Sequence, residues 1–161
     1  MASNSRSVYL AGPLGFSELG RAGQSALAAL ARDLGYEVID PFALAPPGEI
    51  ERIARLSSLD AQREAWRLLN RQIGETNMRA IDGCGLVLAV LDGVDVDSGA
   101  AAEIGYAFAR GKRIVGYRGD FRLAADNVGS TVNLQVEYFI HASGGEIVAS
   151  LDALRARLAI D

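Results

Sequence analysis

Short apolar runs alternate with longer amphipathic segments along this chain, and the alternation predicts strands that alternate with helices. The predicted strands are Ser7–Ala11, Glu37–Ile39, Leu86–Leu91, Arg113–Tyr117 and Glu146–Val148. The third run is apolar at every position, which is typical of a strand buried on both faces of a parallel sheet. The pattern therefore predicts an α/β fold in which a five-stranded parallel sheet lies between layers of helices.

Helical periodicity and capping residues place helices between these runs. The predicted helices span about 18–34, 60–81, 98–110, 133–141 and 151–159, and for the fourth of these a strand at Val136–Ile140 is an open alternative. The connection 41–59 carries Pro46 and Pro47 and a short amphipathic piece near 49–56. This connection is longer than usual, which favours either a wall or lid over a site or a plain surface excursion.

Composition narrows the function classes. The 161 residues, 50% hydrophobic and 22% charged, are typical of one globular domain that buries a core. The net charge of −4 disfavours a nucleic-acid-binding surface. The N-terminus lacks the apolar segment of a signal peptide and no run reaches membrane-spanning length, so a cytoplasmic protein with no membrane partner is expected.

Two kinds of site have little support. The chain has one cysteine, Cys84, and one histidine, His141, which are too few for a Cys/His metal site or a nucleophile triad. The loop after the first strand runs from Gly12 to Phe16 and does not follow the GxGxxG pattern, and GxxxxGK[ST] does not occur. We therefore expect no metal, no dinucleotide and no other cofactor.

Candidate chemistry gathers after the third strand. Asp92, Asp95 and Asp97 crowd the following loop, and Glu103 lies among small residues early in the next helix, for which Asp97 or Ser98 can be the N-cap. Ligands of doubly wound folds bind outside the carboxyl ends of the strands, where this helix begins. An early acid also complements the helix dipole, so a structural role stays open. The crowding favours a functional role, because repulsion between neighbouring carboxylates lowers the stability of the fold unless a ligand or a reaction uses their charges.

Six segments then occur in a recognisable order. They are Val8–Pro13, Asn77–Ile81, Asp97–Gly99, Glu103–Ala107, Gly111–Lys112 and Val132–Leu134. Together they resemble the nucleoside 2-deoxyribosyltransferase family. The resemblance implies a flavodoxin-like (Rossmann-like) three-layer sandwich with five parallel strands. It also implies homo-oligomers built from dimers, either tetramers or hexamers.

Members of this family cleave the N-glycosidic bond of a 2′-deoxyribonucleoside and pass the sugar to another purine or pyrimidine base. The resemblance implies that Glu103 is the nucleophile, that Tyr9 orients its carboxylate and that Asp97 binds the sugar or the base. It also implies that Asn133 reaches into the site of a neighbouring subunit. A carboxylate beneath C1′ can capture an oxocarbenium-like carbon as a glycosyl ester, as in retaining glycosidases.

Further residues are predicted to contact the substrate: Gly12, Phe16, Phe42, Asn77, Asp92, Gly99 and Gln135. Phe16 and Phe42 can stack on a base or simply pack as a wall. Asp92 is also a candidate acid for the departing base. Where many relatives carry an aspartate this chain has Asn77, and where some carry methionine it has Gln135. The acid for the leaving base and the substrate preference are therefore expected to differ from those relatives.

Two other functions stay open. Relatives that hydrolyse 2′-deoxynucleoside 5′-monophosphates resemble this chain around Glu103, but they carry serine and arginine in the first loop to bind phosphate. Here Ser17 and Arg21 come only later, which favours nucleosides, although Arg118 or Arg122 of another subunit could supply such a contact. The second alternative is a non-catalytic nucleoside- or nucleotide-sensing module in which Glu103 is dispensable.

Overall fold

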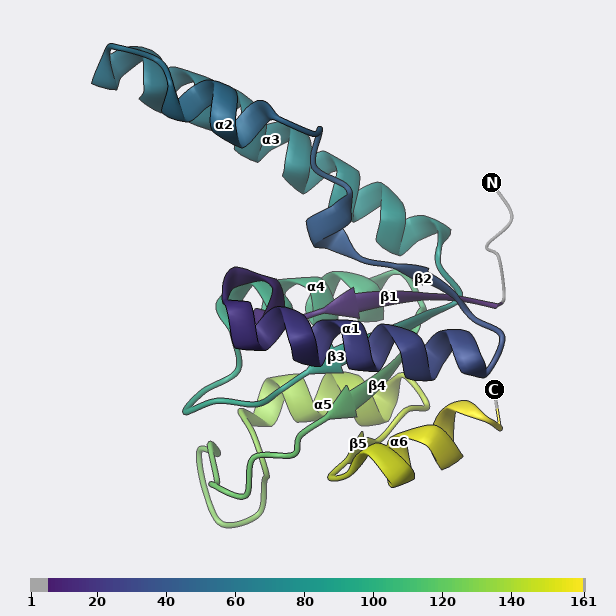
Figure 1. The fold of residues 1–161 in the computed structure, drawn as a ribbon. Coiled ribbons are helices and arrows are strands. Elements are labelled where there is room, and N and C mark those ends of the chain that lie inside the picture. Colours follow the sequence, from purple (N-terminus) through teal and green to yellow (C-terminus); the bar gives the residue numbers. More distant parts are fainter. Residues whose placement is uncertain (1–5, 161) are drawn as a thin grey trace.

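The structure, a computed structural model, describes residues 6–160 and shows a sheet of five parallel strands (Figure 1). The strands are β1 Ser7–Ala11, β2 Glu37–Ile39, β3 Leu86–Val90, β4 Arg113–Tyr117 and β5 Ile147–Val148. Their order across the sheet is β2-β1-β3-β4-β5, and every neighbouring pair is parallel. This is the strand order of the flavodoxin-like doubly wound fold, which confirms the predicted fold class.

Helices connect the strands as the periodicity predicts. They are α1 Glu18–Asp33, α2 Glu49–Ala54, α3 Leu59–Gly83, α4 Ser98–Ala109, α5 Leu134–Ala142 and α6 Leu151–Leu158, with short 3-10 helices η1 Leu14–Phe16 and η2 Pro41–Ala43. Residues 134–142 are helical, so the alternative of a strand at Val136–Ile140 is wrong. Within residues 6–160 no helix combines the length and the apolar character that crossing a membrane requires.

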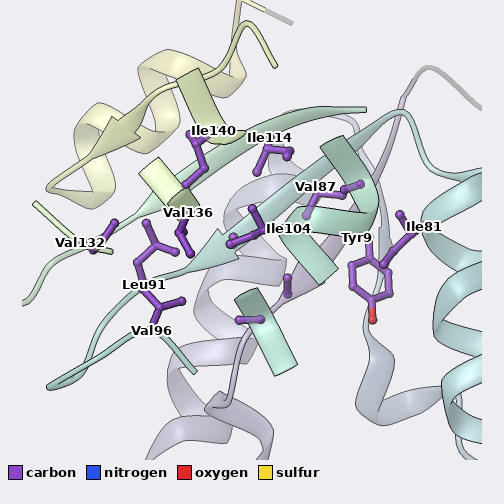
Figure 2. Packing of buried hydrophobic residues seen from close by; sticks show 14 of the residues in the cluster. Tyr9, Ile81, Val87, Leu91, Val96, Ile104, Ile114, Val132, Val136 and Ile140 are labelled. Carbon is purple, nitrogen blue, oxygen red and sulfur yellow. The ribbon is translucent and has the colours of Figure 1, made fainter. Parts of the chain in front are cut away.

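The sheet has an apolar core on each face, because alternate residues of a strand point to opposite sides. On one face Tyr9, Val87 and Ile114 belong to a cluster that includes residues of α3, α4 and α5 (Figure 2). On the other face Val8 and Leu88 belong to a cluster that includes residues of α1 and α6. All five side chains have no exposed surface. Burial on both faces is the reason that β3 is apolar at every position.

The helix pair α2 and α3 extends the molecule beyond the sheet. α2 and the N-terminal half of α3, which we call the arm, project away from the body of the protein (Figure 1). Within the arm α2 packs on α3, and Ile53 of α2 and Leu69 of α3 are buried. The long connection after β2 is therefore an ordered helical element and not an irregular excursion.

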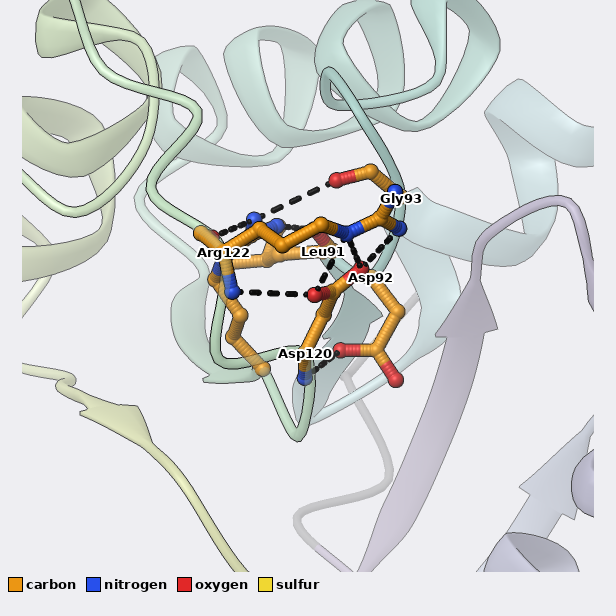
Figure 3. Close-up of polar contacts among 6 residues, drawn as sticks. Leu91, Asp92, Gly93, Asp120 and Arg122 are labelled. Carbon is orange, nitrogen blue, oxygen red and sulfur yellow. Dashed lines mark hydrogen bonds and ion pairs between the residues drawn. The ribbon is translucent and has the colours of Figure 1, made fainter.

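The loops that follow β3 and β4 meet at Leu91–Gly93 and at Asp120 and Arg122 (Figure 3), and a buried arginine joins them. Arg118 is 3% exposed and donates hydrogen bonds to the carbonyl oxygens of Leu91, Gly93 and Arg122. In the same junction the carboxylate of Asp92 accepts a hydrogen bond of 2.9 Å from the backbone N–H of residue 120. These contacts fix the path of the chain from β3 toward the start of α4.

Candidate active site

A cavity of about 440 Å³ lies beyond the carboxyl ends of β1, β2 and β3. This is the place at which parallel α/β sheets bind their ligands. The cavity is lined by Gly12, Phe16, Pro41, Phe42, Ala45, Ile50, Trp66, Asn70, Ile73, Asn77, Asp97, Gly99, Ala100 and Glu103. Most of the lining surface is apolar, and the two carboxylates of the lining, Asp97 and Glu103, both come from the first turns of α4 or its cap.

Glu103 is held at the cavity by two donors. Its Oε1 accepts a hydrogen bond of 2.6 Å from the hydroxyl of Tyr9 and a longer one of 3.5 Å from Nδ2 of Asn77. Tyr9 comes from β1, an inner strand of the sheet, and is fully buried, so its hydroxyl is placed by the core itself. Oε2 of Glu103 accepts no hydrogen bond from residues 6–160, which leaves that oxygen available to a ligand.

Burial shifts the pKa of both Glu103 and Tyr9. Desolvation raises the pKa of Glu103 above its ordinary value, and the charge of Asp97 raises it further, while the hydrogen bonds from Tyr9 and Asn77 lower it. Burial and the neighbouring carboxylate of Glu103 raise the pKa of Tyr9 far above that of a free phenol. Tyr9 therefore keeps its proton and acts as a hydrogen-bond donor to the carboxylate.

Asp97 is the second carboxylate of the cavity. It is the N-cap of α4, and its Oδ2 accepts a hydrogen bond of 3.0 Å from the backbone N–H of Ala100. Oδ1 has no hydrogen-bond partner among the described residues, so it is free to accept a hydroxyl or N–H of a ligand. A side chain at Gly99 would place its Cβ 3.0 Å from Oδ2 of Asp97, so a larger residue at position 99 would crowd this carboxylate.

Two phenylalanines form an aromatic corner of the cavity. The rings of Phe16, from η1, and Phe42, from η2, meet edge to face with centroids 4.9 Å apart. Phe16 is 77% exposed, which is unusual for an aromatic side chain and fits a surface that a flat ligand would cover.

This constellation, with a buried tyrosine on a carboxylate at the edge of a flavodoxin-like sheet, coincides with a family pattern. The model of the nucleoside 2-deoxyribosyltransferase family matches residues 8–137. The chain belongs to this family. The family contains enzymes that transfer or hydrolyse N-glycosyl bonds.

Solved structures with the same fold include members of this family. A 2-desoxiribosyltransferase from Leishmania mexicana is 24% identical, with 96% of this chain and 97% of that one covered and a TM-score of 0.65. A 2-deoxyribosyltransferase from Bacillus psychrosaccharolyticus is 21% identical, with 92% and 90% covered and a TM-score of 0.61. A CMP N-glycosidase from Clostridium botulinum is 20% identical, with 96% and 99% covered and a TM-score of 0.57. No curated protein sequence gives a significant match to this chain.

The cavity brings together seven of the residues that the sequence proposes for the deoxyribosyltransferase site. They are Gly12, Phe16, Phe42, Asn77, Asp97, Gly99 and Glu103, with Tyr9 in contact with the last of them. Three further candidates do not line it. Asp92 is bonded into the junction with the loop after β4, Asn133 caps α5 through hydrogen bonds from the backbone N–H of residues 135 and 136, and Gln135 is exposed on α5.

Part of the cavity wall comes from α2 and α3 and was not predicted from the sequence. Ile50 of α2 and Trp66, Asn70 and Ile73 of α3 line the cavity. The helical periodicity of 60–81 accounts for Trp66 and Ile73 as apolar packing residues and gives Asn70 no role. The signal that could have found Asn70 is spacing, because residues 66, 70, 73 and 77 fall on one face of a helix.

Replacing Gly15 by alanine tests the aromatic corner. The added Cβ would lie 2.2 Å from Cδ2 of Phe42, so the Phe42 ring must move. We expect the KM for a nucleoside to rise about tenfold with little change in kcat, because the loss is one of ground-state binding. Gly74→Ala on α3 is the control, since its Cβ would meet nothing within 4 Å. An unchanged KM in Gly15→Ala would remove Phe42 from the binding surface.

Proposed function

We propose that this protein transfers 2-deoxyribose from one nucleobase to another, with Glu103 as the nucleophile that forms a covalent glycosyl ester. One observation carries the proposal: a half-buried carboxylate faces an apolar cavity with one oxygen held by Tyr9 at 2.6 Å and the other free. Membership of the deoxyribosyltransferase family supports the same chemistry.

In the first step Oε2 of Glu103 attacks C1′ of a 2′-deoxyribonucleoside from the side opposite the base. The bond from C1′ to the carboxylate oxygen forms while the bond from C1′ to the base nitrogen breaks, and the bonding pair leaves with the base. Positive charge develops on the sugar in between, and the negative charge of Glu103 stabilises it. The hydrogen bond from Tyr9 keeps the carboxylate ionised and in line.

The departing base must gain a proton. Asn77 cannot supply it, because an amide has no acidic proton near neutral pH. Asp97 is the carboxyl of the cavity lining that is not the nucleophile, and we assign to it both the hydrogen bond to the sugar and the transfer of this proton. The second step reverses the first: an incoming base attacks C1′, its proton returns to the carboxylate of Asp97, and Glu103 is released as a carboxylate.

Transfer needs an ester that outlasts the exchange of bases. The apolar walls from Phe16, Phe42, Ile50, Trp66 and Ile73 limit water near the ester, which favours a base over water as acceptor. The alternative of a 5′-monophosphate hydrolase is less well supported. No lysine or arginine lines the cavity in the described part of the chain, so a phosphate would meet no cation there.

A product analysis tests the proposal. The protein is incubated with deoxyinosine and free adenine, and the products are separated by chromatography, with Glu103→Gln as the control. We expect deoxyadenosine and hypoxanthine in equal amounts. Hypoxanthine with free deoxyribose would indicate a hydrolase, and binding without any product would indicate a sensing module. A parallel incubation with dAMP or dGMP separates nucleosides from nucleotides as substrates.

The proposal includes a homo-oligomer in which Asn133 contacts the substrate in the cavity of a neighbouring subunit. We expect Asn133→Ser to lower kcat/KM about tenfold, because serine still caps α5 but is too short to reach a partner's ligand. When this variant is mixed with Glu103→Gln under conditions that exchange subunits, about a quarter of the wild-type activity should return, since only mixed interfaces hold an intact site. Activity no higher than the sum of the two variants would contradict a shared site.

A further inference from the structure

One face of α3 presents a stripe of side chains to the cavity. Trp66, Asn70, Ile73 and Asn77 follow one another at spacings of four, three and four residues, and all of them line the cavity. Such spacing keeps side chains on one side of a helix, so the stripe runs outward from the nucleophile along the helix axis. At its inner end Asn77 contacts Glu103, and at its outer end lies Trp66.

The two asparagines of the stripe differ in their freedom. Nδ2 of Asn77 donates to the carboxylate of Glu103, which fixes the orientation of that amide, and its Oδ1 is buried. The side-chain amide of Asn70 is exposed to the cavity and makes no hydrogen bond with residues 6–160. Asn70 therefore has a donor and an acceptor available, and rotation by half a turn exchanges them.

The position of Asn70 fits the length of a purine. With a helical rise of about 1.5 Å per residue, Asn70 lies about 10 Å farther from the nucleophile than Asn77 along α3. In a purine held with C1′ over Glu103, the distance from C1′ to the substituent at position 6, plus the length of one hydrogen bond, is comparable.

We propose that Asn70 is a specificity-determining residue that binds the 6-substituent edge of a purine whose ring lies against Trp66. The inference rests on the proposed function, since it takes C1′ to lie over Glu103. Adenine presents a donor at position 6 and an acceptor at N1, and hypoxanthine presents an acceptor and a donor at the same places. A rotatable amide pairs with either, so one residue serves both an outgoing 6-oxopurine and an incoming 6-aminopurine.

The single tryptophan of the sequence, Trp66, provides a direct probe of this pairing. In the Glu103→Gln background, where no turnover is expected, Trp66 fluorescence is followed during titration with three nucleosides. They are deoxyadenosine, deoxyinosine and purine 2′-deoxyriboside, which has no 6-substituent. The variants compared are Asn70→Leu and, as a matched amide on α3 outside this cavity, Gln72→Leu.

We expect deoxyadenosine and deoxyinosine to quench the emission and to bind about tenfold more tightly than purine 2′-deoxyriboside, the worth of one neutral hydrogen bond. Asn70→Leu should abolish this preference, and Gln72→Leu should retain it. A preference that survives Asn70→Leu, an equal loss of affinity for purine 2′-deoxyriboside, or emission that responds to none of the nucleosides would overturn the inference. Because binding is read without turnover, the inference can hold even where the exchange assay fails.

Discussion

Glu103→Gln is expected to lower kcat/KM for base exchange by about 10⁴-fold. Glutamine keeps the size of the side chain and can still contact Tyr9, but its amide oxygen is a poor nucleophile and carries no charge to stabilise the developing cation. Initial rates of deoxyadenosine formation from deoxyinosine and adenine measure the loss. A variant that retains a tenth or more of the wild-type rate would show that the reaction does not pass through this carboxylate.

Thermal unfolding separates this loss from misfolding. Burial raises the pKa of Glu103 in the folded protein, so its protonated form is favoured there, and its contribution to stability is lost as the pH rises through the raised pKa. At neutral pH the wild type therefore carries an unfavourable buried charge that glutamine lacks. We expect Glu103→Gln to have a Tm equal to or above that of the wild type at neutral pH, and the gap to close below about pH 4, where Glu103 is protonated in both states.

Tyr9→Phe is expected to lower kcat/KM by about ten- to a hundredfold at neutral pH and to move the acidic limb of the pH–rate profile to higher pH. The hydrogen bond from Tyr9 lowers the pKa of Glu103, so its removal raises that pKa, and a higher pH is needed to ionise the nucleophile. Part of the loss should therefore be recovered as the pH is raised. The remainder reflects a carboxylate that is no longer held in line.

Tyr36→Phe is the matched control for this prediction. Tyr36 is also buried, and its hydroxyl donates to the carbonyl oxygen of Leu158 on the opposite face of the sheet from Glu103. This variant should lose some stability and keep the wild-type pH profile. An acidic limb that stays in place in Tyr9→Phe, or shifts to lower pH, would contradict the role given to the phenol.

The sheet and its helices could be predicted from local pattern because each strand is buried in a recognisable way. The runs that became β1, β3 and β4 are mostly apolar since both faces of the sheet are covered, and Ser17 and Ser150 mark helix starts by capping them. Only the order of the strands across the sheet depends on contacts between distant parts of the chain, and the observed order is that of the expected flavodoxin-like fold.

The site was only partly predictable, because the role of a polar residue depends on what its helix faces. Glu103 stood out as an acid among small residues, and its pairing with Tyr9 followed from the family resemblance. Asn70 lies on a long amphipathic helix, and nothing local distinguishes it from a solvated asparagine until α3 is placed beside the cavity. Asp92 was singled out for the crowding of its loop, yet its carboxylate accepts from the backbone of the neighbouring loop.

Mass spectrometry of the reaction intermediate tests the central claim most directly. Wild-type protein is mixed with deoxyinosine, quenched in acid and compared with Glu103→Gln, first as intact protein and then as peptides. We predict a wild-type species heavier by one deoxyribosyl group, with the added mass on the side chain of Glu103, and no such species in the variant. Rapid base exchange with no adduct, or an adduct on a different residue, would contradict the account.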